Sequence, residues 1–328
     1  MTDWRYRFGE NRGTLLAVLI FVVMFTIYVS NHPAGFTSNV VQTAANKGVL
    51  LALIAMAQTF VVVTAGIDLS VGMIFVLANC LASYIVAGSG FSATMGVLGV
   101  LGTGALCGVI NGLVVIFGRL QPIVTTLATG AVYFGIALWL RPNPGGAVDF
   151  NQDIADAVTG KLAFGIPASA VLLAAVVLLI WVPYRRSLVG RAAFAIGSSE
   201  SAAYMSGVSI RRAKLVAYTL SGLLASMGGL FVTFISYSGE ASAANGGTYT
   251  LNSIAAVVLG GVSLFGGSGS AIGAIFGALM LRTIGDLLFV FDLDPLWQPL
   301  FQGVVLLAAV CLGSLRLFRI RNRLDLFG

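Results

Sequence analysis

The 328-residue chain contains little charge, and this scarcity excludes whole classes of protein. Only 9% of its residues are Asp, Glu, Lys or Arg, whereas 58% are hydrophobic. Soluble domains carry roughly 25% charged residues, so the composition excludes a water-soluble enzyme or a secreted domain. The 41 glycines do not argue for disorder, because glycine is common in membrane helices. The composition predicts a multi-pass membrane protein.

Cysteine and histidine are scarce as well. Cys80, Cys107 and Cys311 lie in apolar runs without CxxC spacing, which favours small buried side chains over a disulfide or a metal site. The single histidine, His32, lies in an Asn-His-Pro loop, which argues against a zinc site or a Ser-His-Asp triad. The sequence also lacks a GxxxxGK[ST] motif. We therefore expect no catalytic site, and no metal or cofactor bound by this chain.

Apolar runs long enough to cross a bilayer recur along the chain. A spanning helix needs about 20 residues, and this criterion predicts an all-α bundle of about ten spans in a single domain, residues 1–328. The first run lacks a small-residue cleavage site after it, so we interpret it as an uncleaved helix. The predicted spans are Leu15–Ser30, Lys47–Ala65, Ser70–Ala87, Ala93–Phe117, Ile123–Leu140, Pro167–Pro183, Leu215–Tyr237, Thr250–Phe265, Ser270–Phe291 and Gln298–Leu315.

The basic residues indicate how the bundle is oriented. With the N-terminus inside, fourteen of the 18 Lys and Arg residues fall in cytoplasmic segments. Lys47, Arg141 and Lys161 fall on the external side, and Arg282 lies within a span. This positive-inside bias predicts that both termini are cytoplasmic. The net charge of +6 is therefore a topological signal, and we expect no nucleic acid as a partner.

Two loops are long enough to carry function. Residues 141–166 form an external polar loop with three aspartates that is suited to face a soluble partner. Residues 185–214 form a cytoplasmic loop, in which we expect a short helix at about Ser199–Ser206. Such a helix is either a docking element for another protein or a simple connector between spans.

The expected cytoplasmic helix carries cap signals at both ends. Ser199 is placed as its N-cap, and Glu200 falls in the first turn, where the helix dipole favours an acid. Gly207 is placed as the residue that follows the helix end. Ala202 and Ala203 are small enough to let the helix sit closely in a groove.

Polar residues between or within spans admit two interpretations each. Asp68 suggests a proton relay, but we favour a helix boundary at which Gly66 ends one span and Asp68 or Ser70 caps the next. Asn79 and Asn111 lie inside spans, where such side chains, like Gln58, usually hydrogen-bond between helices and only sometimes bind substrate.

Arg282 and Asp286 are the conspicuous charges inside the predicted spans. They are four residues apart and therefore share one helix face. Either they form an ion pair that locks two helices, or they border the path of a solute. Glu240, Asn245 and Asn252 lie nearby in sequence, on the external side, and are candidates for the mouth of that path or for contact with a docked protein.

Glycines recur at four-residue spacing in two places. This spacing places glycines on one helix face, where they favour close packing of helix backbones over a role in gating. An inverted repeat relating the two halves of the chain is compatible with the span directions, although the two glycine stripes do not align under it. The stripes are Gly104, Gly108 and Gly112, and Gly269, Gly273 and Gly277.

Five segments carry short motifs of glycine and polar residues. The first is a signature between two spans that includes Gly66, Asp68, Ser70 and Gly72. The others are Asn111-Gly112 with Pro122–Thr129, Gly190–Val208, Ile254–Gly261 and Leu264–Gly269. Together, and in this order, the motifs resemble those of bacterial ABC-transporter permeases of the ribose/galactose/xylose type. The chain departs from that family at Ser198-Ser199, where the family usually has Gly-Asn, and at Ser263, which stands in place of a threonine.

This resemblance implies a permease subunit of the bacterial inner membrane. Two copies, identical or paralogous, would form the channel within the membrane lipid, and a periplasmic binding protein would deliver a sugar. Cytoplasmic ATPases would bind ATP and Mg²⁺ and drive transport. The helix that carries Ser199, Glu200, Ala202, Ala203 and Gly207 would then couple this chain to the ATPase.

Three functional hypotheses remain to be separated. A sugar importer needs few charges in its path, which agrees with the nearly charge-free spans; importers of nucleosides and branched-chain amino acids are the alternatives. An ion-coupled secondary transporter would need membrane-embedded acids or a histidine relay. An intramembrane enzyme would need a catalytic pair such as His/Asp or an HExxH motif, and the sequence contains neither.

Overall fold

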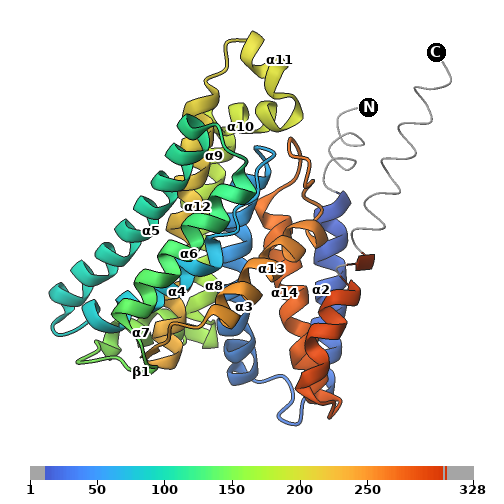
Figure 1. Ribbon diagram of the computed structural model, residues 1–328. Coiled ribbons are helices and arrows are strands. Elements are labelled where there is room, and N and C mark those ends of the chain that lie inside the picture. The colour runs from blue at the N-terminus through green and yellow to red at the C-terminus, as the bar shows by residue number, and fades with distance from the viewer. Residues whose placement is uncertain (1–11, 306, 309–328) are drawn as a thin grey trace.

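The computed structural model shows a bundle of long helices, and it describes residues 12–305 and 307–308 (Figure 1). Seven helices within that part are long and apolar enough to cross a membrane. A further helix begins at Gln298. The elements are α2 (Arg12–Asn31), α3 (Ser38–Val62), α4 (Val71–Ile85), α5 (Gly90–Gly118), α6 (Pro122–Leu140), β1 (Gly145–Gly146), α7 (Gln152–Thr159), η1 (Ala163–Gly165), α8 (Ala168–Val176), η2 (Val177–Trp181), α9 (Val182–Arg186), α10 (Leu188–Ser198), α11 (Glu200–Met205), α12 (Ile210–Ser236), β2 (Ser238–Gly239), α13 (Ala243–Leu259), α14 (Ala271–Val290) and η3 (Pro295–Trp297).

Two predicted spans start seven or more residues away from the helices in the structure. The second span begins at Ser38, nine residues before the predicted start, because Thr37 caps it by accepting a hydrogen bond from the Val40 amide. The predicted span Thr250–Phe265 is wrong in position. Its helix, α13, covers Ala243–Leu259, because the Ser242 side chain caps an earlier start and a glycine-rich loop follows Leu259. The end of the tenth predicted span lies outside the described residues.

The helices differ sharply in how much of their surface the bundle covers. In the most apolar 18-residue window of α3, 83% of residues are buried, whereas the corresponding share is 17% in α2 and 28% in α6. The helix α12 packs against α3, α4 and α5, and α14 packs against α2, α3 and α13. The central helix is thus α3, and the exposed apolar faces of α2 and α6 are suited to contact lipid or another membrane helix.

The first glycine stripe is a packing seam, as predicted. A methyl group on Gly104 would collide with Ser226 and with the Gly222 carbonyl, and one on Gly108 would collide with Tyr218 and Thr219 of α12. The second stripe is only partly helical. Gly273 and Gly277 pack against α13, but Gly269 lies in the preceding loop with φ +121°, so it does not belong to that helix face.

Segments distant in sequence gather at the two ends of the bundle (Figure 1). One end carries α10 and α11, and we call it the cytoplasmic end because of its basic residues. Gly13 contacts Gly261 in the loop after α13, and Gly266 of the same loop contacts Gly197 of α10, so the start of α2 lies at this end. Residues 1–11 and 309–328 lie outside the described part, so the location of both termini stays a prediction, as does the inverted repeat.

The opposite, external end is held together by the predicted polar loop. β1 in that loop pairs antiparallel with β2, which follows α12. Arg141 is buried at the start of the loop, where it donates to the Ser83 hydroxyl and the Gly146 carbonyl oxygen and stacks on Tyr84. The loop is therefore an ordered cap on the bundle.

Candidate functional sites

The predicted cytoplasmic helix is present as α11. The Ser199 side chain accepts a hydrogen bond from the Ala202 amide at 3.3 Å, which confirms Ser199 as the N-cap. Gly207 has φ +75°, and the amides of Gly207 and Val208 donate to the carbonyl oxygens of Tyr204 and Ala203. These two bonds form a Schellman motif, so both ends of this short helix are closed.

The two alanines of α11 point in different directions. Ala203 is only 5% exposed and packs against Ile196 and Ala213 of this same chain. The expectation that both alanines offer a close-packing surface to another protein is therefore wrong for Ala203. The outward face instead presents Tyr204 and Met205, which are 73% and 80% exposed.

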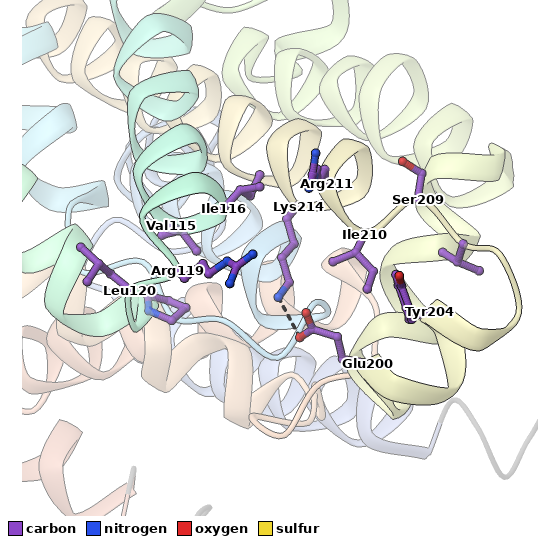
Figure 2. A pocket seen from close by; sticks show the side chains of 12 residues that line it. Val115, Ile116, Arg119, Leu120, Glu200, Tyr204, Ser209, Ile210, Arg211 and Lys214 are labelled. Carbon is purple, nitrogen blue, oxygen red and sulfur yellow. Dashed lines mark hydrogen bonds and ion pairs between the residues drawn. The ribbon is translucent and has the colours of Figure 1, made fainter.

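A hollow of about 550 Å³ lies beside α11 (Figure 2). Glu200 of α11 forms an ion pair with Lys214 of α12 at 2.8 Å. This pair connects α11 to the start of a long helix. Arg119, at the end of α5, and Arg211 add further positive charge to the lining. A protein that contacts α11 would therefore also meet the turn between α5 and α6.

The end of α10 connects this surface to the interior. A methyl group on Gly197 would collide with the Val63 carbonyl oxygen and with the Gly267 amide nitrogen. The Gly267 amide in turn donates to that carbonyl at 3.1 Å. The backbones at Val63, Gly197 and Gly267 thus meet without intervening side chains. Val63 directly precedes the signature at residues 66–72.

The signature residues form a closed, buried junction. The Asp68 carboxylate accepts hydrogen bonds from the Ser70 amide (2.9 Å), the Ser70 hydroxyl (2.6 Å) and the Ser221 hydroxyl of α12 (3.0 Å). With its amide oriented to suit its neighbours, Gln58 of α3 bonds the backbone of Asp68 on both sides. Thr126 of α6 accepts from the Leu69 amide.

The structure corrects the predicted cap roles in this junction. Ala65, with φ +60°, is the left-handed residue after α3, whereas Gly66 leaves room for the nearby Tyr218 hydroxyl. Ser70 occupies the position before α4, but its hydroxyl donates to Asp68 instead of capping the helix. Gly72 is required because a methyl group there would collide with the backbone of α13.

The two asparagines inside spans form interhelical hydrogen bonds. Asn111 of α5 donates to the Ser70 hydroxyl at 2.7 Å and accepts from the Tyr133 hydroxyl at 3.0 Å. Asn79 of α4 donates to Thr233 of α12 and accepts from the Glu240 amide. These contacts support the helix-linking interpretation of both residues over a place in the solute path.

The predicted ion pair of α14 exists, but it has a third member. Arg282 and Asp286 approach to 3.8 Å, and Lys47 of α3 lies 3.5 Å from the same carboxylate oxygen. The prediction placed Lys47 on the external side at the start of a span; it is the tenth residue of α3, in the half of that helix nearer the external end, and its side chain is 45% exposed. Two cations from neighbouring helices therefore share one carboxylate.

A polar cavity of about 290 Å³ adjoins this triad. It reaches from the external ends of α13 and the helix that begins at Gln298 to the middle of α14. Asn245 and Asn252, which the sequence analysis assigned to the external side, both belong to α13 and line the cavity together with Arg282. The remaining lining residues are Lys47, Leu50, Leu51, Thr248, Tyr249, Gln298 and Gln302.

Sequence reasoning missed Lys47, Gln298 and Gln302 as members of this site. Their common signal is a polar side chain in the outer half of an apolar span. This signal identifies candidates but does not say which spans are neighbours. Helix packing brings these residues together.

A bundle with seven helices long and apolar enough to cross a bilayer defines a multi-pass membrane protein. Comparison with known proteins makes the assignment specific. Residues 40–310 match the family described as the permease component of branched-chain amino acid transport systems, and the chain belongs to this family. It is therefore a permease subunit of an ABC importer and a multi-pass protein of the inner membrane.

Several curated relatives are similar over most of their length. The ribose import permease RbsC of Bacillus subtilis strain 168 is 34% identical, with 92% of each chain covered. The fructose import permease FrcC of Rhizobium meliloti is 33% identical over 81% of this chain and 75% of its own. The autoinducer 2 import permease LsrC of Enterobacter sp. strain 638 is 32% identical over 92% of this chain and 87% of its own. No solved structure is significantly similar to the chain.

Proposed function

We propose that this subunit carries a sugar or a sugar-like solute across the inner membrane. The relatives named above are permeases for ribose, fructose and autoinducer 2, and these names support a small hydroxyl-bearing solute. The family description names branched-chain amino acids, which remain the alternative class. The polar cavity favours the first class, because its four amide side chains suit hydroxyl groups, whereas an apolar amino-acid side chain would gain nothing from them.

In the proposed importer, this chain supplies the path and other chains supply the energy and the solute. A cytoplasmic ATPase binds ATP and Mg²⁺, a periplasmic binding protein delivers the solute, and a second permease copy completes the channel. The chain itself then performs no hydrolysis. Membrane lipid covers the outer faces of helices such as α2.

The observation that carries the proposed coupling to an ATPase is the geometry of α11. Tyr204 and Met205 form an exposed apolar surface on a helix that is closed at both ends and anchored through Glu200 to Lys214. An exposed aromatic and a flexible thioether are typical of surfaces that bind another protein. A rigid helix seated on a moving ATPase would transmit its motion through α10 to the buried junction at Asp68.

The test is to replace the outward face of α11 in the complete importer. We expect the double substitution Tyr204→Asp/Met205→Asp to abolish ATPase co-purification and solute uptake while the permease reaches the membrane at its normal level. The matched control is Phe36→Asp, which also places an acid at an exposed apolar position, but in the external loop after α2. Normal ATPase co-purification in the α11 variant would show that the helix is only a connector.

A further inference from the structure

The cavity at the external half of the bundle has an unusual charge composition. Among the described residues that line it, Lys47 and Arg282 are cationic and none is acidic. The nearest acid is Asp286, whose side chain is 9% exposed and pairs with both cations. One carboxylate balances one cation, so this group retains one surplus positive charge next to the cavity.

The two cations also retain hydrogen-bonding capacity. Guanidinium has five N–H donors and ammonium has three, whereas within the described part of the chain both cations pair with the same single oxygen of Asp286. The Nε atom of Arg282 is buried and has no hydrogen-bond partner among the described residues. The planar face of a guanidinium fits a carboxylate through two parallel hydrogen bonds. The two cations therefore retain donors that can bind a further anion.

The rest of the lining suits hydroxyl groups. Asn245, Asn252, Gln298 and Gln302 each offer an amide that donates and accepts hydrogen bonds, and Tyr249 adds an aromatic ring. The volume of about 290 Å³ lies near the lower end of the range for small-molecule sites, about 300–1,000 Å³. Both features fit a solute of monosaccharide size.

We propose that this cavity binds a solute with one carboxylate and several hydroxyl groups, that is, a sugar acid of the aldonate type. The carboxylate pairs with Arg282 and Lys47, and the surplus charge of one matches a monoanion. The hydroxyl groups bind the amides of α13 and of the helix that begins at Gln298. This inference rests on the proposed importer function and names the substrate class.

The electrostatic part of the inference is tested by thiol modification from the external side. A single cysteine is introduced as Thr248→Cys in the cavity, in the assembled importer with Cys80, Cys107 and Cys311 replaced by alanine. Its reaction rates with an anionic reagent, sulfonatoethyl methanethiosulfonate, and a cationic one, trimethylammonioethyl methanethiosulfonate, are compared. The control cysteine is Ala34→Cys, at an exposed position in the external loop after α2.

We expect the ratio of anionic to cationic rate to be about tenfold higher at position 248 than at position 34, because the surplus charge attracts anions. Lys47→Gln or Arg282→Gln should bring the ratio at position 248 toward the control value. Each single substitution leaves Asp286 one cationic partner, so the bundle should fold. Equal ratios at the two cysteines, or a ratio that neither substitution changes, would overturn the inference.

The solute class is tested by uptake into cells that express the complete importer. The probes are the five- and six-carbon aldoses and their matching aldonates, each supplied alone and in competition. We expect an aldonate to be imported, and Arg282→Gln to raise its half-saturation concentration at least tenfold, with partial rescue by Arg282→Lys. Import of neutral aldoses alone, unchanged by Lys47→Gln, would overturn the inference and leave the importer function standing. Failure of the permease without an α11 substitution to co-purify with an ATPase would count against the proposed function, whereas the thiol rates would still decide the charge of the cavity.

Discussion

Two buried aspartates of this protein have opposite kinds of hydrogen-bonding and ionic partners. Asp68 is fully buried and accepts hydrogen bonds only from neutral groups, namely the amide and hydroxyl of Ser70 and the hydroxyl of Ser221. Asp286 is 7% exposed and is shared by the cations Lys47 and Arg282 at 3.5 and 3.8 Å. The contacts of Asp68 are hydrogen bonds of 2.6–3.0 Å. The contacts of Asp286 are longer, and its two cations exceed its single negative charge.

The difference suits the two aspartates to different roles, one in holding helices together and one in binding a ligand. Short hydrogen bonds from several helices fix a junction because each has a narrow range of distance and angle. Shared ion pairs near 4 Å tolerate rearrangement and leave donors that another anion can use. The Asp68 junction therefore holds helices together, whereas the Asp286 triad is suited to a ligand that comes and goes.

Removing the carboxylate of the closed junction should have the largest effect. Asp68→Ala leaves one amide and two hydroxyl donors without their acceptor, and each buried unsatisfied group costs about 1–3 kcal/mol. We expect a strong loss of membrane-inserted protein and a lower thermal unfolding temperature in detergent, measured by fluorescence-detected size exclusion.

The matched control for this change is Asp153→Ala, an exposed aspartate of the external loop. Its removal should change the unfolding temperature little. Equal losses of stability in the two variants would show that the Asp68 junction does not hold the helices together.

The glycine seam next to that junction should show an intermediate effect. Gly108→Ala would push a methyl group into the backbone of α12 at Tyr218 and Thr219, which costs about 1–3 kcal/mol when a tight contact is overpacked. In the same helix, Gly102 faces open space within the described structure. Gly102→Ala should be neutral or stabilising by up to about 1 kcal/mol, since alanine is the better helix former. Unfolding temperatures of the two variants provide the comparison, and similar values would argue against the seam.

The open triad should show the smallest loss and the strongest non-additivity. Asp286→Ala leaves two cations without a carboxylate, whereas Arg282→Ala leaves the Lys47–Asp286 pair intact. We expect Asp286→Ala to lower stability by roughly 1–2 kcal/mol, below the value for a fully buried pair because the Lys47 side chain is 45% exposed.

The triple substitution Lys47→Ala/Arg282→Ala/Asp286→Ala should recover much of the stability lost by Asp286→Ala alone, because it removes all three charges together. Protein level and unfolding temperature are measured for each variant. Strictly additive losses would mean that the three side chains act independently, and the contrast between the two aspartates would then disappear.

The ends of helix α11 were predictable from the sequence, but the direction of its side chains was not. Its caps were predictable because Ser199 and Gly207 act on backbone groups within a few residues. The direction of Ala203 was not predictable, because it depends on Ile196 and Ala213, which approach only when α10 and α12 are packed. Similarly, the spacing of Gly104 and Gly108 predicted a close helix contact, but only the fold shows that the partner helix is α12.

The class of this protein was predictable from the sequence, because the length of the apolar runs, the scarcity of charge and the distribution of Lys and Arg act through the bilayer on each segment separately. The signature and the α11 caps were predictable as well, since they are short-range features. Which polar residues meet depends instead on how the helices pack. Lys47, Asn252 and Arg282 lie far apart in the chain and border one cavity because α3, α13 and α14 pack side by side. That packing depends on shape complementarity along whole helices, which no single segment specifies.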